Sequence, residues 1–172
     1  MTWTAPEVER PGGSLSAPED EMLRGLLEWH RATFLHKCAG LTAEQLSRQP
    51  VPETNLSLQG LIRHLAKVER TWFRRRFRGE DIPILYSTAQ RKDADFEDLD
   101  PALVEQEYQV LLDESQEARE AAAGEDLDAT FVNADGEIAT LRFIHIHMIG
   151  EYARHNGHAD LLRERIDGVT GD

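Results

Sequence analysis

The sequence is poor in cysteine and has no long hydrophobic run. Cys38 is the single cysteine among 172 residues, which excludes an internal disulfide framework. Because Cys38 lies in an apolar helical pattern, we interpret it as a buried structural thiol, with a catalytic thiol as the alternative. No apolar stretch approaches the ~18 residues that a transmembrane helix needs, and no secretory leader pattern opens the chain. We therefore expect a cytoplasmic protein with no membrane partner.

Positive charge is also scarce. Lysine and arginine number 19 against 32 aspartate and glutamate residues, which gives a net charge of −13. A field of this sign repels nucleic acid and anionic membranes, so neither is an expected partner. The one basic cluster consists of Arg74, Arg75, Arg76 and Arg78. We expect it to close a helix C-terminus, where the helix dipole favours cations.

The sequence does contain a recurring helical pattern. Hydrophobic residues make up 40% of the chain, enough for a folded core. They recur at three- and four-residue steps in four segments of about 20 residues. The predicted helices run from Pro18 to Gly40, from Ser57 to Gly79, from Pro101 to about Ala123, and from about Thr140 to Ile166. Each is bounded by residues that favour helix starts or ends.

Four amphipathic helices without a strand-rich region predict an all-α four-helix bundle. The acidic segment 80–99 is long enough for a crossover connection. Before the last helix, Asp135-Gly136 in a weakly alternating stretch predicts a small β-hairpin or a tight loop. Residues 1–17 are predicted to be an irregular arm that Trp3 pins to the surface. Residues 1–172 are expected to form one domain.

The predicted inner face of the last helix carries polar side chains. At ~100° per residue, His147, His155 and His158 lie within about 40° of Glu151 on the helical wheel, among apolar residues. A buried carboxylate has to be paired, protonated or bound to a metal. Glu151 and His155 are four residues apart, so their side chains project toward one point. This geometry is typical of paired metal ligands on a helix.

The helix that begins at Ser57 offers a third ligand. His64 lies at the flank of its apolar face, so it can converge with Glu151 and His155 if the two helices face each other. Helical bundles build metal sites in this way. Two imidazoles and one carboxylate leave at least one coordination position open, which is typical of catalytic sites. Zinc is the first expectation, and iron, nickel and manganese accept the same ligand types.

Other interpretations of these residues stay open. Glu151 can instead pair with a neighbouring histidine or with Arg154 in a partly wet core, without a metal. His158 is a candidate fourth ligand, a partner that orients a ligand, or a general base. His147 is a further candidate on the same face, with a less central position.

Two segments carry a resemblance to a known family. "NLSLQGLIRHLAKVERTWF" and "EYARHNGHADLLRERIDG" resemble the DinB-like metal-binding four-helix-bundle superfamily, and in particular its uncharacterised actinobacterial single-domain branch. The resemblance extends over nearly the whole chain. It implies a divalent metal held by His64, Glu151 and His155. The glutamate at the first of the two last-helix positions resembles the mycothiol-dependent maleylpyruvate isomerase group. His158 stands where many members have glutamine, so the resemblance leaves it outside the ligand set.

The same resemblance implies thiol chemistry and a homodimer. The function it favours is a metal-dependent S-transferase that joins a low-molecular-weight thiol, such as mycothiol or bacillithiol, to an electrophilic small molecule. We do not expect isomerase activity, because the isomerase has a further C-terminal domain and this chain ends at Asp172. The alternatives are a non-enzymatic metal-binding or stress-related protein and a metal-dependent hydrolase.

Overall fold

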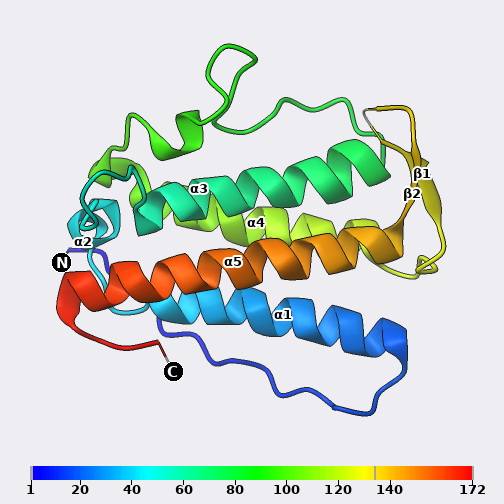
Figure 1. Ribbon diagram of the computed structural model, residues 1–172, viewed down its shortest axis with the longest axis horizontal. Coiled ribbons are helices and arrows are strands. Elements are labelled where there is room, and N and C mark those ends of the chain that lie inside the picture. Colours follow the sequence, from blue (N-terminus) through cyan, green and yellow to red (C-terminus); the bar gives the residue numbers. More distant parts are fainter. Residues whose placement is uncertain (1, 134, 172) are drawn as a thin grey trace.

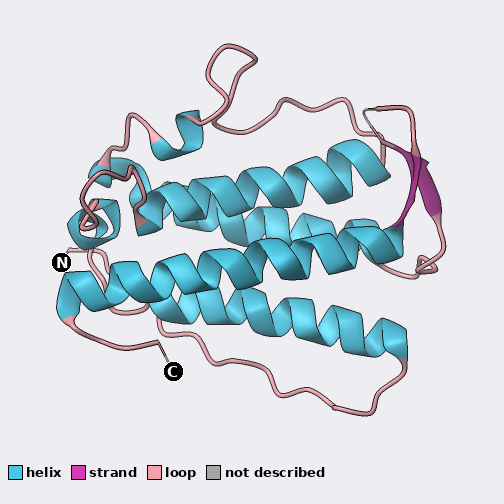
Figure 2. Ribbon diagram, viewed as in Figure 1, coloured by secondary structure: helices cyan, strands magenta, loops and turns pink. Residues whose placement is uncertain are grey.

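Helices dominate the part of the chain that the computed structural model describes, residues 2–133 and 135–171 (Figures 1 and 2). The α-helices are α1 (Glu19–Cys38), α2 (Ala43–Ser47), α3 (Leu58–Glu69), α4 (Val104–Ala122) and α5 (Leu141–Asp167). Shorter helical pieces are the π-helical segment η1 (Arg70–Phe77) and the 3-10 turns η2 (Ala94–Phe96) and η3 (Pro101–Leu103). Strands β1 (Thr130–Val132) and β2 (Ile138–Thr140) form an antiparallel hairpin directly before α5. The predictions of a mainly helical chain and of this hairpin are confirmed.

The four long helices lie side by side, with α1 along α5, α3 along α4, and α3 also against α5. Following the colours of Figure 1, α3 and α4 run in one direction and α1 and α5 in the other. The segment between η1 and η3 makes the parallel arrangement of α3 and α4 possible, because it returns along α3 to the end where α3 began. Thus α3 faces α5 in antiparallel fashion. The core between the helices includes the fully buried Phe34, Phe73 and Tyr152.

Capping residues place the helix starts where the sequence predicts them. The Ser57 hydroxyl accepts a hydrogen bond from the backbone N–H of Gly60, and the Thr140 hydroxyl accepts one from Phe143. These bonds satisfy backbone donors that a helix N-terminus leaves free. Gly168 follows α5 with φ of 81°, a conformation that glycine adopts without strain. The two helices that carry the predicted ligands therefore have defined starts.

The C-terminal part of the predicted second helix is not α-helical. Its backbone widens into a π-helix from Arg70 to Phe77. In this segment Phe73 is buried, while Arg70 and Arg74 both reach the Glu114 carboxylate on α4. The basic cluster does lie at the end of a helical segment, as predicted. Its residue Arg78 pairs with Glu125.

Residues 2–17 contain no helix or strand and form one β-bridge, between Thr4 and Thr42. Trp3 packs edge-on against Tyr108 of α4, with ring centroids 5.7 Å apart. Cys38 is fully buried, as predicted for a structural thiol. No helix in the described ranges is long and apolar enough to cross a membrane.

Candidate metal centre

The facing surfaces of α3 and α5 bring His64, Glu151 and His155 together. One ligand atom from each residue lies within 4.8 Å of the others. His64 Nε2 is 3.6 Å and His155 Nε2 is 3.5 Å from Glu151 Oε2. These separations exceed those of ordinary hydrogen bonds, so neither ring is hydrogen-bonded to the carboxylate that lies between them. The structure thus juxtaposes the three residues selected from the sequence, and their role as ligands stays a prediction.

Two ring nitrogens of this cluster lack a hydrogen-bond partner among residues 2–133 and 135–171. These atoms, His64 Nε2 and His155 Nε2, are both buried. A buried polar atom without a partner is unfavourable, and most such atoms in folded proteins are satisfied. Two imidazole nitrogens and one carboxylate oxygen are donors that zinc and other first-row divalent cations accept. The residues present therefore fit a divalent metal.

Electrostatics favour a cation at this point. The neighbouring His155 and His64 hold the pKa of Glu151 well below its usual range, against the opposing effect of burial. Glu151 is therefore an anion at neutral pH. Burial alone would lower the pKa of His64, but its contacts with Asp95 and Glu151 outweigh burial and raise it. Glu151 thus carries the negative charge that a bound cation would neutralise.

Sequence reasoning missed Asp95. This residue lies in η2, within the long acidic connection, and its side chain is fully buried. Its Oδ2 lies 2.8 Å from His64 Nδ1 and 2.5 Å from Lys67 Nζ. Burial raises the pKa of Asp95, but the bonds from His64 and Lys67 outweigh it and lower the pKa overall. The only available signal was the unusual length of the acidic connection, which does not single out one acid.

His158 and His147 lie on either side of the cluster. His158 Nδ1 is 3.2 Å from His155 Nδ1, so His158 contacts the nitrogen of His155 that points away from Glu151. His147 Nε2 is 3.6 Å from Glu151 Oε1, and its ring centroid is 4.4 Å from that of Trp72. Burial lowers the pKa of both His147 and His158. Both imidazoles are therefore neutral at pH 7, and their roles stay predictions.

The cluster is partly exposed to solvent. The side chains of His64 and Glu151 are 18% and 19% exposed, while that of His155 is 7% exposed. His155 is therefore the most buried of the three residues.

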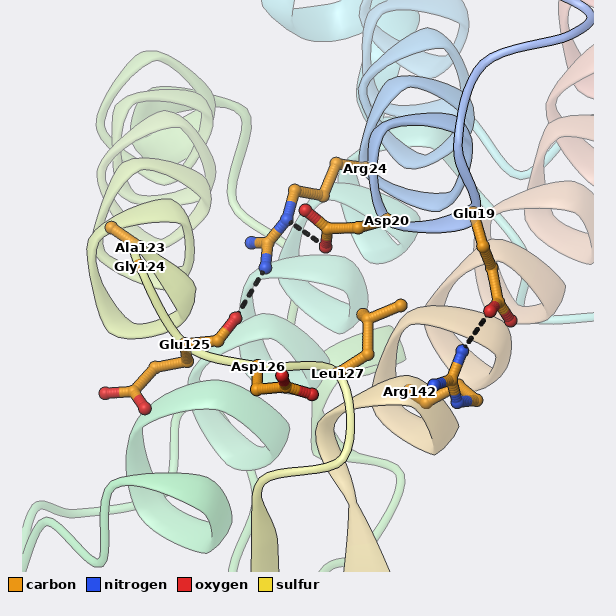
Figure 3. A pocket seen from close by; sticks show the side chains of 9 residues that line it. All are labelled: Glu19, Asp20, Arg24, Ala123, Gly124, Glu125, Asp126, Leu127 and Arg142. Atoms are coloured by element: carbon orange, nitrogen blue, oxygen red, sulfur yellow. Dashed lines mark hydrogen bonds and ion pairs between the residues drawn. The ribbon is translucent and has the colours of Figure 1, made fainter.

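A separate hollow lies away from this cluster. Figure 3 shows this cavity of about 700 Å³, between the start of α1 and the loop that follows α4. Its charged side chains are already paired with protein groups. Arg24 bonds to Asp20 and to the carbonyl of Glu125, and Arg142 pairs with Glu19. It offers none of the unpartnered donors that distinguish the His64 cluster.

The comparisons with known proteins point to one family. A family model described as mycothiol-S-transferase matches residues 22–168. The matched range contains His64, Asp95, Glu151 and His155. Searches among curated proteins and among solved structures gave no match.

Proposed function

Since this chain belongs to the mycothiol-S-transferase family, we propose that it is a metal-dependent enzyme that transfers a small thiol such as mycothiol to an electrophilic small molecule. In this reaction the thiol loses its S–H proton and its sulfur forms a bond to an electrophilic carbon. As this bond forms, the bond between that carbon and its leaving group breaks, and the electron pair of the broken bond departs with the leaving group. The observation that carries the proposal is the pair of buried, unpartnered nitrogens, His64 Nε2 and His155 Nε2, beside the Glu151 carboxylate.

The proposed ligands of the metal are His64, Glu151 and His155. Zinc is the first candidate, and iron, nickel and manganese suit the same donors. When bound, a divalent cation lowers the pKa of a coordinated thiol, so that the thiolate forms at neutral pH. Three protein ligands leave room for that thiol. His158, behind His155, is proposed to orient that ring and not to bind the metal.

The thiol is proposed to come from outside the chain. Cys38 is the single cysteine of the sequence, it is fully buried, and burial raises the pKa of its thiol to about 12. It is therefore neither accessible nor ionised at neutral pH. A neutral imidazole near the cluster can take up the proton of an incoming thiol. His147 is proposed for this role, because its ring is partly exposed beside Glu151.

The frame of the site is proposed to be a four-helix bundle made by α1, α3 with η1, α4 and α5, with residues 78–100 as its crossover connection. In such a bundle, side chains on facing helices form the site. The single domain over residues 1–172, the cytoplasmic location and the homodimer predicted from the sequence are retained as parts of the same proposal.

The test is a conjugation assay on the purified protein. Zinc-loaded protein is mixed with mycothiol and a chromogenic electrophile such as a chlorodinitrobenzene, and the conjugate is quantified. Bacillithiol, glutathione and cysteine replace mycothiol in parallel reactions. We expect a rate that a chelator abolishes and that added zinc restores. No metal-dependent rate with any thiol would contradict the proposal. Metal-dependent hydrolysis in thiol-free buffer would instead support a hydrolase.

A further inference from the structure

We propose that Asp95 is a positioning residue that holds the His64 ring in the orientation needed for metal binding. This inference rests on the proposed ligand set. It extends the centre beyond α3 and α5 to the crossover connection. No sequence spacing relates Asp95 to the ligands, because it follows His64 by 31 residues and approaches it only in the folded chain.

The hydrogen bond between His64 and Asp95 fixes the position of the ring proton. An ionised carboxylate only accepts hydrogen bonds, so at 2.8 Å the proton between Asp95 Oδ2 and His64 Nδ1 belongs to the ring. A neutral imidazole has one N–H, so a proton on Nδ1 leaves Nε2 with a free lone pair. That Nε2 is the buried atom without a partner that faces Glu151. Asp95 therefore selects the tautomer in which His64 can act as a ligand.

Asp95 is itself held in place by α3. Lys67, one turn after His64 on α3, pairs with Oδ2 at 2.5 Å. Ser87, earlier in the connection, accepts a hydrogen bond from the same Lys67 ammonium at 3.1 Å. The carboxylate thus lies between two side chains of one rigid helix. A carboxylate that only balanced charge at the surface would not be fully buried at such a point.

The backbone on either side of Asp95 is also bound to α3. The Arg63 guanidinium donates to the carbonyl oxygens of Ala94 and Glu97, on either side of Asp95. The Phe96 ring lies 5.3 Å from the His64 ring, centroid to centroid. It also approaches Gly60 so closely that a Cβ at Gly60 would lie 2.8 Å from Phe96 Cδ1. Segment 94–97 therefore contacts α3 at Gly60, Arg63 and His64.

A coupling follows from these contacts. If ordering of segment 94–97 favours metal binding, metal binding must favour the order of that segment by the same free energy. The crossover connection is then part of the metal centre, in addition to linking two helices.

The test compares Asp95→Asn with Asp93→Asn. Asp93 is an exposed acid two residues away whose side chain caps no helix, so both variants lose the same charge from the same connection. Zinc affinity is measured by competition with a fluorescent chelator. We expect Asp95→Asn to bind zinc about 10- to 100-fold more weakly than Asp93→Asn, as for other partners of metal-bound histidines. Equal affinities would overturn the proposal.

A second measurement does not depend on metal or on activity. In metal-free wild-type protein, nitrogen NMR at a pH where His64 is neutral reports which ring nitrogen carries the proton. We expect Nδ1–H in the wild type and a mixture of tautomers in Asp95→Asn. A wild-type ring protonated on Nε2 would overturn the proposal even if Asp95→Asn fails to fold. Absence of zinc binding by the wild type would contradict the proposed function, and the tautomer would still decide the role of Asp95.

Discussion

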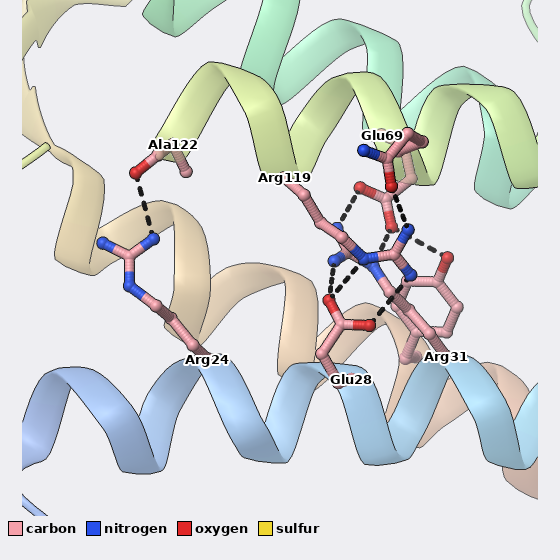
Figure 4. Close-up of polar contacts among 8 residues, drawn as sticks. Arg24, Glu28, Arg31, Glu69, Arg119 and Ala122 are labelled. Atoms are coloured by element: carbon pink, nitrogen blue, oxygen red, sulfur yellow. Dashed lines mark hydrogen bonds and ion pairs between the residues drawn. The ribbon is translucent and has the colours of Figure 1, made fainter. Parts of the chain in front are cut away.

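A buried ion pair joins α1 to α3 in the core of the protein. The guanidinium of Arg31 on α1 donates two hydrogen bonds to Glu69 on α3, at 2.7 and 2.6 Å. The hydroxyl of Tyr152 donates a third to Glu69, at 2.8 Å. Figure 4 shows this network with Glu28 and Arg119 at its outer edge. Tyr152 directly follows Glu151 on α5, so its hydrogen bond to Glu69 joins α3 to the turn of α5 that carries Glu151.

Removal of the Glu69 carboxylate from this network is expected to destabilise the folded protein. Glu69→Ala leaves the Arg31 guanidinium, which is 5% exposed, as a buried charge without its main partner. We expect a loss of about 3–5 kcal/mol in the free energy of unfolding, measured in urea. Glu120→Ala, which changes an exposed acid on α4, serves as the control and is expected to change stability by less than about 0.5 kcal/mol. Equal effects of the two changes would refute the structural role of the ion pair.

His145 provides a prediction for pH dependence. Burial lowers its pKa, since the side chain is packed in the core beside Phe73. The unfolded chain then binds a proton near pH 6.5 that the folded chain still excludes. Stability therefore falls as the pH drops below about 6.5, until the folded-state pKa is reached. We expect metal-free wild type to lose more stability between pH 7 and pH 5 than His145→Gln, in urea unfolding. Parallel losses would show that His145 does not contribute.

The proximity of His64, Glu151 and His155 could be predicted from the sequence, whereas the residues around them could not. Glu151 and His155 are four residues apart on one helix, so their proximity follows from helix geometry alone. The proximity of His64 to these two residues follows if the apolar faces of the two helices pack against each other. Asp95 could not be found in this way, because its approach depends on the path of an irregular connection. The ion pair of Arg31 and Glu69 likewise joins two helices through long side chains whose partners no periodicity indicates.

Among the helices and strands, the contact between α3 and the crossover connection depends on one glycine. Gly60 lies in the first turn of α3, where Phe96 packs against it. A glycine-to-alanine change within a helix normally stabilises it by about 1 kcal/mol. At Gly60 the new methyl group would have to displace Phe96, and with it the neighbouring Asp95.

We therefore expect Gly60→Ala to weaken zinc binding and to speed cleavage of residues 84–97 by a protease. Gly25→Ala is the matched control, because Gly25 also lies in a helix and a Cβ there would contact nothing within 4 Å. It is expected to leave both properties unchanged. If the two variants bind zinc equally well, packing of Phe96 on α3 does not support the site.

Helix boundaries were predictable where a side chain marks them. Ser57 and Thr140 begin α3 and α5 as expected from their capping chemistry, and Gly168 ends α5. The π-helical segment after Glu69 was not predictable. The residues of this segment do not distinguish a π-helix from an α-helix. The segment also makes contacts with α4, such as the pair of Arg70 and Glu114, that the local sequence does not indicate.

In the molecule as a whole, a bound metal would link two helices that are far apart in sequence. His64 is on α3, whereas Glu151 and His155 are on α5. The unfolded chain does not hold these residues together, so a ligand that binds only the folded state stabilises it. The relative direction of the helices was only partly predictable. The length of segment 80–99 allowed a crossover, but its path along α3 depends on contacts such as those of Arg63.

Zinc is thus expected to raise the melting temperature of the protein. At about 100 times the dissociation constant, the stabilisation is about 2.7 kcal/mol. For a chain of this size, this corresponds to a rise of about 5–10 °C. Calorimetry with zinc and with a chelator measures the shift. A melting temperature that is the same in both conditions would indicate that the cluster holds no metal in the folded state.

The most direct test of the metal centre is the metal content of the native protein. Wild type, His64→Ala and His36→Ala are purified in parallel and analysed by elemental mass spectrometry. His36 is a half-buried histidine on α1, outside the cluster, and so controls for loss of an imidazole. We expect about one divalent metal per chain in wild type and in His36→Ala, and almost none in His64→Ala. Equal metal content in all three would contradict the ligand assignment.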